Sequence, residues 1–178
     1  YSACFRREAG SYRKEERGMV RGHQFNKIEM FQFTTPDQST KAFEELVKNA
    51  EKLVEGLGLH FRTVKLAAED CSAAMAKTYD IEVWIPSMET YKEVSSISNA
   101  LDYQARRGNI RFKKSPSASS EQAGKNDFLH TLNASGLATS RLVPAILEQF
   151  QQKDGSVEMP KVLRDWVGKK KLQNLKLN

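Results

Sequence analysis

Three short stretches rich in β-branched and aromatic residues follow one another between residues 61 and 100. They cover 61–66, 79–86 and 91–100, and the connection at 67–77 is long enough for only about one helical turn besides its loops. Parallel strands need a longer crossover, usually a full helix. Because these stretches lack regular strand–helix alternation, the sequence predicts an antiparallel sheet flanked by helices, an α+β fold.

Two amphipathic helices are predicted beside this sheet, and a last short helix is predicted to begin near Pro160. The first long helix opens with Pro36 in its first turn and stops at the Gly-Leu-Gly stretch 56–58, and the second covers 138–152. The first carries apolar residues at spacings of three and four: Phe43, Leu46, Val47, Ala50, Leu53, Val54 and Leu57. Further strands are expected at 2–9, 23–33, 109–112 and 127–133.

The chain of 178 residues is long enough to bury one core, which we expect within residues 1–166. A serine- and lysine-rich run of low hydrophobicity at 114–127 predicts a mobile loop. Residues 167–178 read as a basic, frayed tail. Because the sequence starts at Tyr1, inside a strand-like stretch and without a methionine, we expect a fragment of a longer protein.

Charge and cysteine content narrow the class of function. A net charge of +6 favours an anionic partner such as nucleotide phosphates or RNA, although a basic solvated surface would give the same number. Two distant cysteines and three scattered histidines predict no zinc site and a reduced, cytoplasmic setting. The sequence contains no run of eighteen apolar residues, so no membrane span is expected.

The stretch from Cys4 to Met30 carries a high density of charge on and between two predicted strands. Side chains alternate between the faces of a strand, so Phe25 and Glu29 share a face about 13 Å apart. An arginine from the neighbouring strand could lie between them, and its planar fork suits phosphate oxygens. The distance between Phe25 and Glu29 is close to the length of an extended nucleotide conjugate, so this face could bind one. The alternative explanation of the charges is that they form cross-strand salt bridges on an exposed sheet.

Four blocks of sequence together resemble the class II aminoacyl-tRNA synthetases, in the version found in seryl-tRNA synthetases. The blocks are motif 2 at 3–33 (CFRREAG to HQFNKIEM), a central strand at 77–87 (KTYDIEVWIPS), the EVSS-to-QARR segment at 91–112, and motif 3 at 130–151 (HTLNASGLATSR onward). They agree with the family in order and spacing. The chain is therefore similar to the C-terminal part of such a catalytic domain.

The resemblance implies roles around ATP. Arg6 would hold the α-phosphate and Arg141 would clamp the γ-phosphate, which makes them the two catalytic candidates, and Phe25 would stack on adenine. The other ATP-binding positions that the match implies are Arg7, Glu8, Arg21, Gly22, His23, Gln24, Glu93, Val94, Ser95 and Ser96. Glu8 would approach the adenine end or the terminal adenosine of tRNA.

The resemblance also implies a serine pocket and a metal pair. Glu29 would bind the ammonium group of serine, and Asn133 and Ser135 match serine-side positions. Glu93 and Ser96 match the pair that binds Mg²⁺. Strict alternation along a strand puts these two on opposite faces, so a β-bulge or a backbone contact is needed to bring both to one metal.

The implied function is ATP-dependent activation of serine to seryl-adenylate and its transfer to tRNA(Ser), with ATP and Mg²⁺ and without zinc. Motif 1, the dimer interface of the family, would lie upstream of Tyr1. We therefore expect a homodimer of the full-length protein and an inactive isolated fragment. Two alternatives stay open: an amino acid:carrier-protein ligase with the same core, and a non-catalytic synthetase paralogue.

Overall fold

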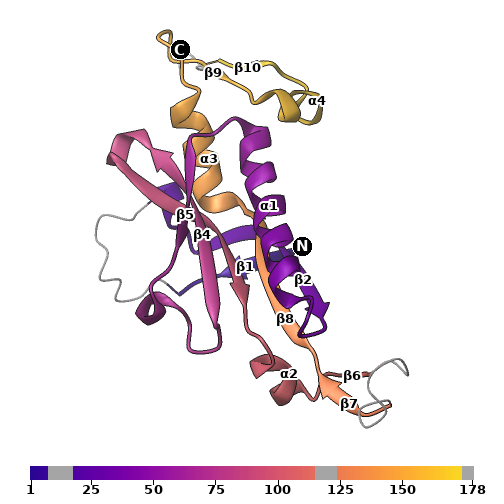
Figure 1. Cartoon of the computed structure of the whole chain (residues 1–178). Helices are drawn as coiled ribbons and strands as arrows, with labels where there is room; N and C mark the ends of the chain where they lie inside the picture. Colours follow the sequence, from indigo (N-terminus) through magenta and orange to yellow (C-terminus); the bar gives the residue numbers. More distant parts are fainter. Residues whose placement is uncertain (8–17, 115–123, 174–178) are drawn as a thin grey trace.

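A computed structural model describes residues 1–7, 18–114 and 124–173, which build a six-stranded sheet with flanking helices (Figure 1). The order across the sheet is β1-β2-β8-β5-β4-β3, and all neighbouring strands are antiparallel. The strands are β1 (Ser2–Phe5), β2 (Gln24–Thr34), β3 (Phe61–Lys65), β4 (Lys77–Ile85), β5 (Thr90–Asn99) and β8 (His130–Ala138). The predicted α+β fold is confirmed.

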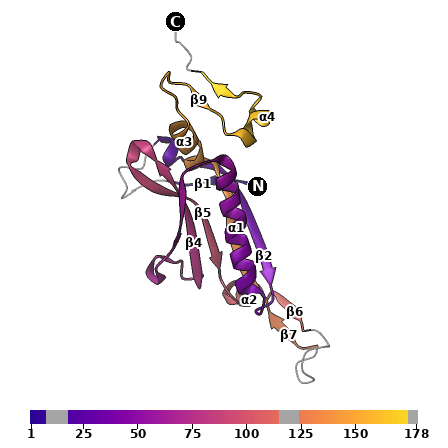
Figure 2. The same ribbon diagram turned by 45° about the horizontal axis from the view of Figure 1, so that its top comes forward.

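Two helices, α1 (Ser39–Leu57) and α3 (Thr139–Gln149), pack against the core side of this sheet (Figures 1 and 2). The predicted stripe of α1 is buried except for Leu53, which is 41% exposed. The sheet supplies buried partners from three strands: Ile81, Val83, Ile85, Val94, Ile97, Leu132 and Ala134. Each fully buried side chain of this size contributes about 1.5–3 kcal/mol, so this layer holds the domain together.

The helix α1 ends as its sequence predicts but begins later. Gly58 adopts a left-handed conformation with φ of +73° and donates its N–H to the Glu55 carbonyl, which stops the helix. Pro36 was expected in the first turn. Instead the N–H of Gln38 donates to the Thr35 carbonyl, so Pro36 lies in a turn that precedes the helix.

Alternation along β4 divides the sheet into two faces. Ile81, Val83 and Ile85 are fully buried on the side of the helices. Asp80 and Glu82 therefore point to the opposite side, termed here the polar face. The polar side chains of the neighbouring strands gather on this face.

A β-bulge in β5 changes which side chains reach the polar face. Glu93 pairs with Glu82, and Ser96 pairs with Asp80, so β5 holds the extra residue Val94 between the two pairs. Asp80 and Glu82 are two residues apart and share a face, and their partners Glu93 and Ser96 share it too. The bulge expected as one way to bring these two residues together is present.

A second irregularity lies where β8 meets α3. Lys27 pairs with Ala138, but Glu29 pairs with Ser135, so β8 has one residue more than β2 in this interval. Leu137 has a positive φ of 112° in the bulge. Alternation within β2 is preserved, and Lys27 and Glu29 remain on one face.

A small unit projects beyond the lower end of the sheet in Figure 1. It consists of α2 (Tyr103–Gly108), β6 (Arg111–Lys113) and β7 (Asn126–Phe128), with β6 and β7 antiparallel. The mobile loop predicted at 114–127 is wrong at its end, because Asn126 and Asp127 pair with β6. Residues 115–123 of that loop lie outside the described residues.

The C-terminal residues form a second small sheet next to α3. The elements are β9 (Val157–Glu158), the turn η4 (Lys161–Leu163), α4 (Arg164–Val167) and β10 (Lys171–Leu172). The short helix predicted near Pro160 is confirmed. The basic tail predicted at 167–178 is wrong over 171–172, because β10 pairs with β9 and Lys171 Nζ lies 2.9 Å from Asp154. Residues 174–178 lie outside the description.

Strand β1 is shorter than predicted, since it ends at Phe5 and leaves Arg6 and Arg7 beyond its end. The backbone N–H of Arg6 still donates to the His23 carbonyl at 2.8 Å, so the chain stays beside β2. Short turns of 3-10 helix occur at η1 (Gly18–Val20), η2 (Ala68–Asp70) and η3 (Pro86–Met88). Of the helices in the described parts of the chain, none is long and apolar enough to cross a membrane.

Candidate active site

A pocket on the polar face is assembled from distant parts of the chain. The turn η1, the strands β2, β5 and β8, the start of α3 and the residue after β1 all contribute to it. Lys27 and Ser135, which meet at its floor, are 108 residues apart in sequence. The lining residues are Arg6, Val20, Arg21, Gly22, Phe25, Lys27, Glu93, Val94, Ser135, Ala138, Ser140 and Arg141.

One end of the pocket combines an arginine with an aromatic ring. The guanidinium of Arg6 lies 5.0 Å from the centroid of the Phe25 ring. Cys4 pairs with Phe25 across β1 and β2, which fixes the position of the residues that follow β1. Arg6 is exposed, so its charge is free to meet an anion beside a flat apolar ring.

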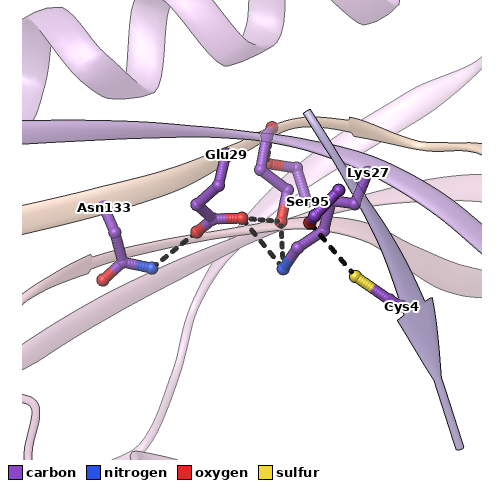
Figure 3. A network of polar contacts seen from close by, with 7 residues as sticks. Cys4, Lys27, Glu29, Ser95 and Asn133 are labelled. Atoms are coloured by element: carbon purple, nitrogen blue, oxygen red, sulfur yellow. Dashed lines mark hydrogen bonds and ion pairs between the residues drawn. The ribbon is translucent and has the colours of Figure 1, made fainter.

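Next to two lining residues of the pocket, Lys27 and Ser135, lies a hydrogen-bonded carboxylate, Glu29, whose side chain is 16% exposed (Figure 3). Asn133 Nδ2 donates to one oxygen at 2.9 Å, and Ser135 Oγ donates to the other at 3.3 Å. The ammonium of Lys27 lies 2.8 Å from the same carboxylate and 3.4 Å from Ser135. This carboxylate is anchored by two hydrogen bonds and is already in contact with one amine.

The third part of the pocket is formed by Arg141, in the first turn of α3. Its Nη1 donates to the backbone carbonyl of Glu93 at 2.7 Å and lies 3.7 Å from the Glu93 carboxylate. The Arg141 side chain is only 13% exposed, whereas that of Glu93 is 47% exposed. The bulge thus presents Glu93 to both the pocket and the arginine.

Asp80 lies behind this arginine and was not predicted as a site residue. Burial, with a smaller contribution from the charges of Glu93 and Glu82, raises the pKa of Asp80 to about 6, against the lowering effects of a hydrogen bond with Ser96 and of the charge of Arg141. Its Oδ1 is buried without a hydrogen-bond partner among the described residues. From the sequence alone, the alternation of side chains along residues 77–85 could have predicted that Asp80 and Glu82 share a face. That Asp80 lies opposite Ser96 depends on the pairing register of β4 with β5, which the sequence alone does not give.

Of the other candidates, some line the pocket and some lie outside it. Arg21 and Gly22 line the pocket, and Val94 lines it at the bulge. The hydroxyl of Ser95 is fully buried on the core side and donates to the Ser135 carbonyl at 2.8 Å, and the ATP-binding role of Ser95 stays a prediction.

Arg7 and Gln24 are exposed and absent from the pocket lining. The His23 ring nitrogen Nδ1 lies 3.3 Å from the Arg6 carbonyl oxygen, which gives His23 a role in holding the chain after β1. Glu8 lies outside the described residues. Lys27, in contrast, lies at the centre of the site although the sequence reading gave it no role.

No group of three or more His, Cys, Asp or Glu side chains within the described ranges could hold a metal ion by itself. Two oxygen donors on one face, Glu93 and Ser96, suit a hard cation that keeps water and phosphate oxygens as its other ligands. Taken together, the site offers two arginines, an aromatic ring, an amine-binding carboxylate and a pair of oxygen ligands. These are parts for aligning a nucleotide with a small amine-bearing acid.

Comparison with known proteins gives a family. Residues 1–150 match the model of the tRNA synthetase class II core domain (G, H, P, S and T). The chain belongs to this family. The class II core thus accounts for β1 to α3, and the small C-terminal sheet follows it.

Curated proteins similar to this class II core include serine--tRNA ligases. The chain is 69% identical to "Serine--tRNA ligase 2" of Clostridium acetobutylicum over 97% of its own length and 39% of the relative. It is 50% identical to "Serine--tRNA ligase" of Petrotoga mobilis, over 95% of its length and 38% of the relative. The chain therefore spans about two-fifths of the curated relatives that it matches.

Two solved structures share the fold of the class II core. The seryl-tRNA synthetase of Pyrococcus horikoshii complexed with ATP superposes with a TM-score of 0.89 at 41% identity, over 98% of this chain and 38% of that one. The cytoplasmic serine-tRNA ligase of Naegleria fowleri in complex with AMP gives a TM-score of 0.85 at 37% identity, over 98% and 40%.

Proposed function

We propose that the full-length protein containing this chain activates serine with ATP to seryl-adenylate and transfers the seryl group to tRNA(Ser). One observation carries the proposal. A single pocket is lined both by Arg6 and Arg141, two arginines suited to phosphate groups, and by Lys27 and Ser135. The last two residues contact the anchored carboxylate of Glu29. The names of the relatives at up to 69% identity support serine as the substrate. We also propose a cytoplasmic location, as expected for an enzyme that charges tRNA.

The proposed ATP position runs along the pocket from Phe25 to Arg141. Adenine stacks on the Phe25 ring, and Arg6, held 5.0 Å from that ring, contacts the α-phosphate. Arg21 reaches the β- and γ-phosphates, and Arg141 clamps the γ-phosphate. Preorganised arginines in a partly enclosed site stabilise the extra charge that develops on the phosphates in the transition state.

The proposed serine position lies over Glu29. The contact between Glu29 and the Lys27 ammonium supports amine recognition at this carboxylate. Free serine carries both an ammonium and a carboxylate, and the Lys27–Glu29 pair offers the complementary charges at one place. We therefore add Lys27 to the serine-binding residues Glu29, Asn133 and Ser135.

Mg²⁺ fits the proposed site through Glu93 and Ser96. The bulge places both donors on the polar face, and the buried, unpartnered Oδ1 of Asp80 leaves negative charge beside them. When bound, Mg²⁺ neutralises phosphate charge in such sites.

The proposed chemical step needs no general base. The serine carboxylate is already ionised and attacks the α-phosphorus, the bond to the bridging oxygen breaks, and pyrophosphate leaves with the electron pair. The protein contributes alignment of two anions, which oppose each other in water, and stabilisation of the transition state by Arg6 and Arg141. Glu29 and Lys27 orient serine for the attack.

ATP–pyrophosphate exchange by the full-length protein tests the proposal, with serine, threonine, alanine and glycine offered separately beside an Arg6→Ala variant. Exchange that serine stimulates and the variant loses is the expected result. Exchange with another amino acid would move the function to a carrier-protein ligase, and a folded protein without exchange would be a non-catalytic paralogue. The 178-residue chain alone is expected to show no tRNA charging.

Homodimerisation of the full-length protein, through a motif 1 outside this chain, stays a prediction. Light scattering after size-exclusion chromatography checks it, since a monomeric mass for the active full-length enzyme would contradict it.

Removing the ring of Phe25 should weaken ATP binding. Stacking of a base on an aromatic side chain is worth about 1–3 kcal/mol, so Phe25→Ala should raise KM for ATP about 10-fold or more and leave KM for serine nearly unchanged. Exchange kinetics measure both constants. Phe33→Ala, at an exposed aromatic residue on the same strand, is the control, and an equal effect of the two variants would remove Phe25 from the adenine site.

Asp80→Asn should stabilise the metal-free protein at neutral pH. The native pKa of Asp80, about 6, is above the value of 3.8 for an unperturbed aspartate, so the native state binds more protons between these values. Stability of the wild type therefore falls as pH rises through this window, and the amide variant escapes that loss.

Because Asp80 is partly exposed, we reduce the expected gain to about 1 kcal/mol, or about 2–4 °C in Tm for a chain of this size. Thermal unfolding in EDTA from about pH 4.5 to about pH 8 measures it. The difference between Asn variant and wild type should grow with pH and reach a plateau at neutral pH. A constant difference at all pH values would contradict the raised pKa.

A further inference from the structure

The unit made by α2, β6 and β7 contributes no described residue to the pocket. We term residues 102–114 and 124–128 the basic hairpin unit. Figure 1 shows it projecting beyond the end of the sheet where β8 begins. Its six basic and two acidic side chains give this described part a net charge of +4, compared with +6 for the whole chain. Positive charge concentrated on a protruding element is typical of a surface that binds a polyanion.

Two exposed arginines of this unit are held in place by aromatic rings. The Arg107 guanidinium lies 3.7 Å from the centroid of the Tyr103 ring, one helical turn away. The Arg111 guanidinium lies 4.0 Å from the Phe128 ring, and its Nε donates to Asn109 Oδ1 at 2.8 Å. Side chains that are ordered before a partner arrives lose less conformational entropy on binding.

These two arginines keep their charge for a partner. Arg106 is paired with Asp102 at 3.2 Å, and Lys114 with Asp127 at 2.9 Å. Across the described residues, Arg107 and Arg111 form no ion pair with a carboxylate. The acidic side chains of the unit are thus occupied by other cations.

Strand pairing collects the unpaired charge on one face of the hairpin. Arg111 pairs with Phe128, and Lys113 pairs with Asn126, so these four side chains share a face. Arg111 and Lys113 lie about 7 Å apart along β6. Asp127 lies on the opposite face, since it alternates with its neighbours. The face of Arg111 and Lys113 therefore carries positive charge without an acidic residue among the described positions.

The basic hairpin unit is fixed to the strand that carries the active-site residues Asn133 and Ser135. Thr131 Oγ1 in β8 donates to Gln104 Oε1 of α2 at 2.7 Å, and Ala105 is fully buried. The unit is therefore anchored to the catalytic sheet at one end, while its charged face points to solvent.

We propose that the basic hairpin unit binds the phosphate backbone of RNA, through Arg107 on α2 and through Arg111 and Lys113 on the exposed face of the hairpin. Contacts to phosphates position an RNA without reading its sequence. The identity of that RNA as the tRNA substrate rests on the proposed function, and it makes the unit a second contact for a tRNA whose end lies in the pocket.

Binding of fluorescein-labelled tRNA(Ser) to the full-length protein tests this inference, with ATP–pyrophosphate exchange measured on the same preparations. The variant carries Arg107→Gln and Arg111→Gln together. Lys48→Gln with Lys52→Gln removes the same charge from the exposed side of α1 and is the matched control. Both pairs are exposed, and circular dichroism checks that each protein is folded.

We expect the arginine variant to lose about 10-fold in tRNA affinity at about 0.15 M salt and the slope of log K against log salt to fall by about 1 to 2. Exchange should be unchanged, and the lysine control should bind like the wild type. Wild-type affinity in the arginine variant, or an equal loss in the lysine control, would overturn the inference. A wild type without serine-dependent exchange would remove the proposed function, and a selective loss of RNA binding would then still support the RNA surface.

Discussion

Replacing Arg141 by alanine should lower kcat/KM for serine-dependent ATP–pyrophosphate exchange about 100- to 1,000-fold, the usual effect of removing one preorganised donor to a developing anion. The guanidinium is only 13% exposed, so water replaces its charge poorly. It is also held toward the pocket by the Glu93 carbonyl at 2.7 Å. Arg141→Lys should recover little of the loss, because an ammonium cannot bind the carbonyl and a phosphate with the same planar geometry.

The control for this variant is Arg164→Ala in the small C-terminal unit. Arg164 also bonds a carboxylate, that of Glu158 at 2.7 Å, and is 25% exposed, but it does not line the pocket. The Arg164→Ala variant should catalyse pyrophosphate exchange like the wild type. Because Arg141 also donates a hydrogen bond to the Glu93 carbonyl, the Tm of both variants is measured to check that they are folded. Normal exchange in a folded Arg141→Ala protein would remove Arg141 from the ATP site.

Replacing Glu29 by glutamine should raise KM for serine about 100-fold, as expected when a charged hydrogen bond worth about 1.5–3 kcal/mol is lost. The change keeps the shape and the acceptor oxygen for Asn133, so the fold should be preserved. Lys27 loses its counter-charge, which further disfavours a second ammonium in the site. KM for ATP should change less than about 3-fold, because the nucleotide binds to other groups.

An inhibitor pair sharpens this test. Serinamide retains the amine of serine and lacks its carboxylate, whereas glycerate retains the carboxylate and lacks the amine. The wild type should bind serinamide more tightly than Glu29→Gln does, and the two proteins should bind glycerate with similar affinity. Glu51→Gln, at a part-buried carboxylate on α1 that accepts a bond from Thr63, is the control. Equal loss for both inhibitors would argue that Glu29 acts on the fold rather than on the amine.

The local patterns of the sequence predicted the fold well. Apolar spacing located α1, because a helix that covers a sheet must bury one continuous stripe. Alternation and the absence of long crossovers predicted the antiparallel pairing of β4 with β5. The family resemblance supplied Arg6, Phe25, Glu29 and Arg141 as candidates; three of them line one pocket, and Glu29 is bonded to the lining residues Lys27 and Ser135. Their chemical roles stay predictions until the variants are measured.

Features that depend on strand register were out of reach. Asp80 becomes a neighbour of Ser96 only through the cross-strand pairing, and Ser95 turns to the core because Val94 is an extra residue. One residue of difference in register exchanges the two faces of a strand, and local sequence does not contain the position of the partner strand. The strand β10 was missed for the same reason. It pairs with β9 at only two positions, and so short a strand gives little apolar pattern in the sequence.

The strand order has a consequence for synthesis on the ribosome. β2 occupies its place between β1 and β8, but contacts such as Lys27 with Ser135 close over 108 residues of chain. A nascent chain that ends before His130 contains all of β2 and lacks the strand beside it, so one edge of β2 has unpaired backbone groups. Long-range pairing of this kind forms slowly. The pocket can therefore be complete only after Arg141 has left the exit tunnel. Until β8 emerges and pairs with it, β2 is an exposed edge strand that a chaperone could bind.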